Sequence, residues 1–206
     1  MNMTRLMGTA ALLATTTFAA QSALAYQAGD IYVRGGFEKA DPTSDNGDIA
    51  NQDLDVSEEN GFAYGAGYLF HDKFGVELNG SEAMEHDIAV NGGNVGSVDR
   101  TPVNLMLNYY PLGGVENARV HPYVGVGMNY THFSDEDIDT GDDLDLEESW
   151  GWAGQAGLDL VIDDHWAANM AVWYLDIDSD VDLNGKDIGE IEVDPYVIMA
   201  GISYRF

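Results

Sequence analysis

The sequence has no cysteine, only 8 basic residues in 206, and no run of about 20 apolar residues after position 25. Without cysteine, no disulfide can stabilise the fold. Because 36 acidic residues give a formal charge of −28 at pH 7, a protein that binds the phosphates of nucleic acids is excluded on electrostatic grounds. The absence of a long apolar run excludes a transmembrane helix in the same region.

The first 25 residues have the three parts of a secretory signal peptide. Arg5 supplies a positive charge, residues 6–20 form a short apolar run, and Ala23-Leu24-Ala25 has the small residues of a cleavage site. A retained N-terminal helix is the alternative, but the apolar run is too short to span a membrane. We therefore expect cleavage after Ala25 and a single domain over residues 26–206.

The C-terminal stretch, residues 194–206, alternates between two kinds of side chain. One set is apolar and has aromatic residues at both ends: Tyr196, Ile198, Ala200, Ile202, Tyr204 and Phe206. The other set is mostly small or polar and ends in Arg205. A period of two predicts a strand between two different environments. Aromatic residues at both ends are typical of a strand that crosses a bilayer, because aromatic rings favour the two membrane interfaces.

The same alternation recurs along the chain and predicts eight strands. Their ranges are 29–39, 61–70, 73–82, 99–110, 120–132, 149–161, 166–178 and 193–206. The long, mostly acidic segments at 40–60, 83–98, 134–148 and 179–192 alternate with short connections, as extracellular loops alternate with periplasmic turns in outer-membrane barrels. We therefore predict an all-β fold, an eight-stranded antiparallel up-and-down transmembrane β-barrel in the bacterial outer membrane. A secreted β-sandwich is the alternative.

The inward faces of the predicted strands are rich in glycine and alanine, which leaves room for a slender cavity. Arg34, Glu77, Asp159 and Arg205 also fall on these faces. Opposite charges inside a narrow barrel are expected to form a paired network that plugs and stiffens it. An ion-selective role for these residues is the alternative.

Several segments carry a family resemblance. They are Gly75-Val76-Glu77-Leu78, the run from Pro122 to Thr131, Ser149-Trp150-Gly151, the run from Val172 to Asp178, and Val193-Asp194-Pro195-Tyr196. In this order they resemble the OmpW family of small outer-membrane proteins. The resemblance implies a barrel with a narrow, largely apolar channel that admits small hydrophobic compounds and releases them sideways into the membrane.

Trp173 is the residue most directly connected to a channel function. The predicted register points it inward near mid-barrel, and the resemblance implies that a tryptophan at this position faces the channel. The opposing constriction position is usually apolar in the family, but in this sequence it is Asn79. Two interpretations remain open, because a large ring can gate the lumen or simply fill it.

The acidic segments can bind divalent cations or provide a solvated, charged surface. Asp180, Asp182 and Asn184, followed by Gly185, match the first half of a Ca²⁺-binding loop, but the closing glutamate is replaced by Ile191. Asn184-Gly185 is also a good hairpin turn. The sequence therefore offers these three residues as a weak metal site only.

No catalytic constellation is recognisable, because the five histidines are scattered and lack partners at a known spacing. We therefore expect no enzyme and no cofactor. The predicted function is passive permeation of small hydrophobic molecules through a narrow lumen, with outer-membrane lipids and these solutes as partners. The alternative is a plugged structural or surface-interaction barrel, of an adhesion or receptor type, that acts through its acidic loops.

Overall fold

The computed structural model describes residues 26–41, 48–49, 52–90, 93–138, 144–183 and 186–206. The predicted signal peptide at 1–25 lies outside these residues. Within the described part of the chain, no helix is long and apolar enough to cross a membrane.

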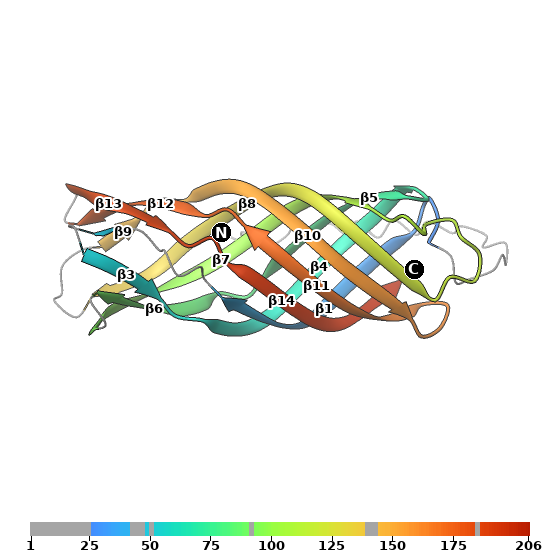
Figure 1. Ribbon diagram of the computed structural model, residues 1–206, viewed down its shortest axis with the longest axis horizontal. Helices are drawn as coiled ribbons and strands as arrows, with labels where there is room; N and C mark the ends of the chain where they lie inside the picture. The colour runs from blue at the N-terminus through green and yellow to red at the C-terminus, as the bar shows by residue number, and fades with distance from the viewer. Residues whose placement is uncertain (1–25, 42–47, 50–51, 91–92, 139–143, 184–185) are drawn as a thin grey trace, which may run out of the picture.

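Eight long antiparallel strands form a closed wall (Figure 1). They are β1 (Ile31–Asp41), β4 (Glu59–His71), β5 (Phe74–Ser81), β7 (Gly93–Tyr109), β8 (Val120–Ile138), β10 (Ser149–Val161), β11 (Trp166–Leu175) and β14 (Tyr196–Arg205). Pairing of β1 with β14 and of β5 with β7 closes the sheet, so the wall has no free edge. The eight-stranded barrel predicted from the alternation is confirmed.

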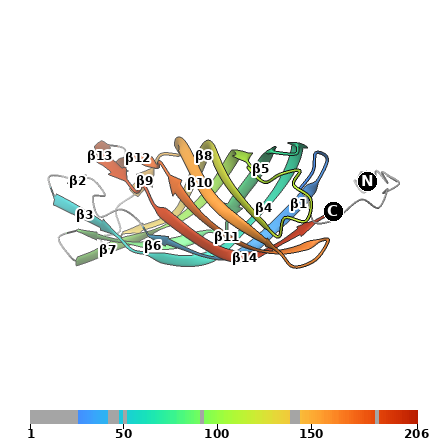
Figure 2. The same cartoon turned by 45° about the vertical axis from the view of Figure 1, so that its right-hand side comes forward.

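The segments predicted as long loops differ from expectation, because much of each is strand. Six short strands occur there: β2 (Asp48–Ile49), β3 (Gln52–Val56), β6 (Met84–Val90), β9 (Leu144–Leu146), β12 (Asp178–Leu183) and β13 (Lys186–Glu192). Figure 2 shows them extending the barrel at one end. The physical reason is that polar–apolar alternation continues beyond the wall, as in Asp53-Leu54-Asp55-Val56, and antiparallel pairing satisfies the backbone.

The outer surface of the wall is apolar. Phe37, Trp150 and Trp152 are 79%, 68% and 72% exposed, which a protein in water would not tolerate on this scale but a lipid environment favours. Aromatic rings pair across strands near both ends, with centroids 4.8 Å apart for Trp166 and Tyr204 and 4.7 Å apart for Tyr130 and Trp150. These exposed side chains exclude the secreted β-sandwich.

Candidate functional site in the barrel lumen

The half of the lumen nearest the short turns is closed by a buried ionic network. The Arg34 guanidinium on β1 donates to Glu77 Oε2 on β5 at 2.7 Å and to Asp159 Oδ2 on β10 at 2.8 Å. It also lies over the rings of Tyr32 and Tyr123, with its carbon 4.4 and 4.5 Å from their centroids. Three strands on different sides of the barrel are thereby joined through the middle.

Neutral donors complete this network, so neither carboxylate depends on the arginine alone. Glu77 Oε2 also accepts from the Tyr32 hydroxyl at 2.8 Å and from the Asn108 amide at 2.7 Å. Asp159 accepts from the Tyr26 hydroxyl at 2.8 Å and the Asn169 amide at 2.7 Å. The expected plug of opposite charges is therefore present, and a ring of tyrosines surrounds it.

The inward glycines do not leave a channel at this level, contrary to the sequence expectation of a cavity. Gly67 pairs with Tyr32 across β4 and β1, and Gly157 pairs with Tyr123 across β10 and β8. A Cβ on either glycine would overlap the tyrosine ring. The space that glycine frees is therefore filled by a tyrosine ring from the neighbouring strand.

Trp173 lies above this plug and is held by a polar chain. Its indole Nε1 donates to Gln155 Oε1 at 2.6 Å, and the Gln155 amide donates in turn to Asn108 of the ionic network. Asn79 does lie at mid-barrel, but its oxygen accepts from the Asn104 amide at 2.9 Å. The constriction is therefore lined by amides as well as by the indole ring.

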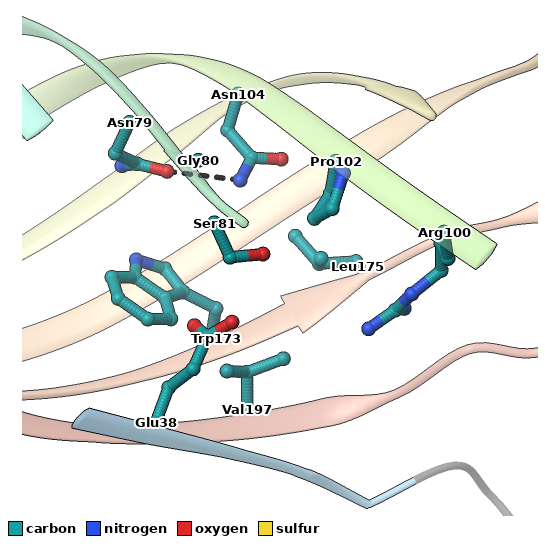
Figure 3. A pocket seen from close by; sticks show the side chains of 10 residues that line it. All are labelled: Glu38, Asn79, Gly80, Ser81, Arg100, Pro102, Asn104, Trp173, Leu175 and Val197. Carbon is teal, nitrogen blue, oxygen red and sulfur yellow. Dashed lines mark hydrogen bonds between the residues drawn. The ribbon is translucent and has the colours of Figure 1, made fainter. Parts of the chain in front are cut away.

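A small cavity of about 10 Å³ adjoins Trp173 on the side away from the plug (Figure 3). Glu38, Ser81, Arg100, Leu175 and Val197 are among the side chains that line it. Such a volume holds about one water-sized group.

The cavity borders an irregular part of the wall between β5 and β7. Regular pairing ends at Gly80 with Val103 and resumes at Met84 with Arg100, so residues 81–83 face residues 101–102. Proline at position 102 has no N–H to donate, and the backbone N–H of Glu82 donates instead to Phe62 of β4 at 3.1 Å. We call residues 81–83 and 101–102 the wall interruption.

Arg205 points inward as predicted but lies at the rim, apart from Arg34, Glu77 and Asp159. Its Nη1 is 3.3 Å from Asp30 Oδ2, and its guanidinium carbon lies 5.2 Å from the centroid of the Tyr26 ring. Burial raises the pKa of Asp30 above its ordinary value, although the Gln27 backbone N–H and Arg205 act in the opposite direction. This group closes the turn end of the barrel.

The structure thus places Trp173, Asn79, Arg34, Glu77 and Asp159 inside the lumen and Arg205 at its mouth. Whether they line a path for solutes stays a prediction. Sequence reasoning placed Asn108, Gln155 and Tyr123 on inward faces but did not connect them with the charged residues. It missed the remaining members of the interior: Tyr26, Tyr32, Arg100 and Tyr110. The sequence pattern that could have indicated the tyrosines is an inward tyrosine opposite an inward glycine on the neighbouring strand.

The candidate metal ligands Asp180, Asp182 and Asn184 lie outside the residues whose side chains are described. A different triad, Asp176, Asp178 and Asp194, has carboxylate oxygens within 4.8 Å of one another. Asp194 accepts from the Ile177 N–H at 3.0 Å and the Tyr174 hydroxyl at 2.8 Å. These contacts hold the end of β11 against the start of β12, one of the short strands that extend the barrel.

Comparison with known proteins identifies the family of the chain, and the barrel fold agrees with it. The model of the OmpW family matches residues 27–206. The chain belongs to the OmpW family. Outer membrane protein W of Escherichia coli (strain K12) is 36% identical to it over 210 residues, which are 96% of this chain and 98% of that relative.

Solved structures agree with this assignment, and a more distant relative matches over most of the chain. The crystal structure of OprG from Pseudomonas aeruginosa has a TM-score of 0.80 at 34% identity, covering 89% of this chain and 98% of that one. The solid-state NMR structure of AlkL in lipid bilayers has a TM-score of 0.70 at 26% identity, covering 93% and 96%. The dibenzothiophene metabolism operon protein PahQ of P. aeruginosa is 24% identical over 203 residues, covering 94% and 93%. The chain is a bacterial outer-membrane barrel of a non-enzymatic family.

Proposed function

We propose that this barrel lets small, mainly apolar molecules cross the outer membrane passively, and that they leave through the wall. The observation that carries the proposal is the contrast between the two halves of the lumen. The turn-end half is closed by the Arg34 network, whereas the other half has a largely apolar interior and a cavity at the wall interruption. A solute entering from the loop end would therefore reach the bilayer sideways.

The apolar interior beyond Trp173 is formed by side chains from many strands. The larger aliphatic and aromatic side chains of this buried cluster are Val98, Phe133, Leu175, Ile177, Val193 and Val197. Such a lining solvates apolar molecules better than ions. The name of PahQ connects one relative with the metabolism of dibenzothiophene, an apolar aromatic compound, which supports the same class of solute.

The experiment is transfer of dibenzothiophene into vesicles whose outer leaflet is lipopolysaccharide, because sugar chains of that leaflet slow apolar solutes. Arrival is followed through a quencher attached to lipids of the inner leaflet. We expect vesicles with protein to take up dibenzothiophene faster than vesicles without it. Sucrose should enter both kinds of vesicle at the same rate. Equal dibenzothiophene rates with and without protein would refute the proposal.

A second function is favoured by the same network. Since Arg34, Glu77 and Asp159 plug the turn-end half, the barrel can also serve as a rigid support for a surface that binds other molecules through the strand extensions. Under this alternative neither solute crosses faster, so the vesicle experiment separates the two functions.

A further inference from the structure

Arg100 is a buried cation that Glu38 attracts electrostatically but that no described residue holds by a hydrogen bond. Its side chain is 1% exposed, and none of its three guanidinium nitrogens has a hydrogen-bond partner among the described residues. Arg34, by contrast, is bonded to two carboxylates. Figure 3 shows the Arg100 side chain reaching from β7 into the cavity. The cavity therefore contains a strong, unused set of hydrogen-bond donors.

A guanidinium buried without a hydrogen-bond partner is unfavourable, because the charge loses its hydration and gains no hydrogen bond in return. Glu38 lines the same cavity from β1. In the wall, β4 and β5 lie between β1 and β7, the strand that carries Arg100. It forms no ion pair with Arg100. An oxygen of an incoming anion fits the cavity volume of about 10 Å³ and could receive the free donors.

The surroundings of Arg100 define the rest of such a ligand. Asn79 and Asn104 lie on one side of the cavity, and their amides bond to each other. Leu175 and Val197 line the cavity as well and belong to the apolar cluster that fills the loop-end half. A ligand that satisfies both environments has one anionic end and an apolar body. A carboxylate suits a guanidinium as an acceptor of charge-assisted hydrogen bonds, and one of its oxygens fits the cavity.

We propose that Arg100 and this cavity form a binding site for the carboxylate of small apolar acids. The carboxylate receives hydrogen bonds from Arg100, and the hydrocarbon body displaces or contacts Leu175 and Val197. The site rests on the proposed function, since it lies on the route from the apolar interior to the wall interruption. It adds a substrate class that an apolar lining alone would reject, namely molecules that carry one negative charge.

Glu38 sets how tightly the acid is held. As a second carboxylate on the same cavity it competes for Arg100 and repels an incoming anion. Replacing Glu38 by glutamine is therefore expected to strengthen carboxylate binding, whereas replacing Arg100 by glutamine abolishes it. The two variants change the site in opposite directions, which loss of folding would not do.

Binding is tested by NMR of the arginine side chains, with hexanoate as the probe and 1-hexanol as the uncharged control. Only Arg34, Arg100, Arg119 and Arg205 follow residue 25, so four Nε signals are expected and Arg100→Gln assigns one of them. Measurements at about 0.15 M salt screen the acidic exterior. We expect hexanoate to shift the Arg100 signal, hexanol to leave it in place, and Glu38→Gln to lower the hexanoate concentration needed by about tenfold.

Two results would overturn the site. One is an Arg100 signal that does not shift with hexanoate but does shift in Glu38→Gln, because Arg100 would then interact with Glu38 and with no added carboxylate. The other is an equal response of Arg34 and Arg100, which would indicate unspecific binding. Neither outcome depends on transport. The proposed function fails separately, if neither hexanol nor dibenzothiophene crosses the vesicle membrane faster with protein than without.

Transport provides the second readout. In vesicles with a lipopolysaccharide outer leaflet, we expect Arg100→Gln to lower the ratio of hexanoate to hexanol transfer by about tenfold, with hexanol unchanged. Unchanged hexanol transfer shows that the variant is folded. An unchanged ratio, or an equal loss of both probes, contradicts carboxylate recognition by Arg100.

Discussion

Replacing Arg34 by methionine tests whether the buried network holds the barrel together. The variant loses the bonds to Glu77 at 2.7 Å and Asp159 at 2.8 Å, and leaves two carboxylates buried without a cation. Removing one partner of a buried ion pair costs about 3–5 kcal/mol. Each carboxylate keeps neutral donors, so we expect a loss near this range rather than twice its size. Urea unfolding in lipid vesicles, followed by tryptophan fluorescence, measures the change.

Lys39→Met is the matched control, because it removes a cation from the same strand at an exposed pair. Lys39 Nζ lies 2.6 Å from Glu58 Oε2, but their side chains are 45% and 61% exposed. Exposed pairs contribute about 0–1 kcal/mol. We expect Arg34→Met to destabilise the barrel clearly more than Lys39→Met. Equal effects of the two variants would refute the reasoning about the interior network.

Three further changes follow from individual contacts. Gly157→Ala forces the Tyr123 ring aside and is expected to cost about 1–3 kcal/mol in urea unfolding, whereas Gly154→Ala on the same strand meets no atom and should be near neutral. Trp173→Ala empties the space beside the cavity, so we expect faster dibenzothiophene transfer, and an unchanged rate would count against a gate. Backbone N–H donors lower the pKa of Asp163, so its contribution to stability is present above its unfolded pKa and lost as pH falls through the folded one. Asp163→Asn should flatten the stability curve below about pH 4, measured by unfolding at a series of pH values.

The alternation of side chains predicted the wall well, because lipid outside and a packed lumen inside impose a period of two on every strand. The range 149–161 was predicted to the residue for β10. The strands at 99–110 and 120–132 were too short, since β7 begins at Gly93 and β8 ends at Ile138. Beyond the membrane the lipid no longer selects for apolar residues, so the change of composition was mistaken for the end of the strand.

The interior could be predicted only as a set of inward residues. Which of them meet depends on the stagger between strands, and the sequence of a single strand contains no information about it. Opposite charge predicted a network of Arg34 with Glu77 and Asp159, and these two acids, on β5 and β10, are its partners. Tyr26, which precedes β1, folds into the lumen and bonds to Asp159. The sequence did not single out Arg100 as a binding residue, because an inward arginine is expected to be paired with an acidic residue.

The most direct test of sideways exit is the rate of dibenzothiophene transfer through the Ser81→Leu variant. Ser81 is buried at the wall interruption and lines the cavity. Leucine fills this space without burying a new polar group. We expect transfer to fall to the rate of protein-free vesicles in Ser81→Leu while Arg34→Met keeps at least the wild-type rate. Wild-type transfer by the Ser81→Leu barrel would contradict exit through the wall.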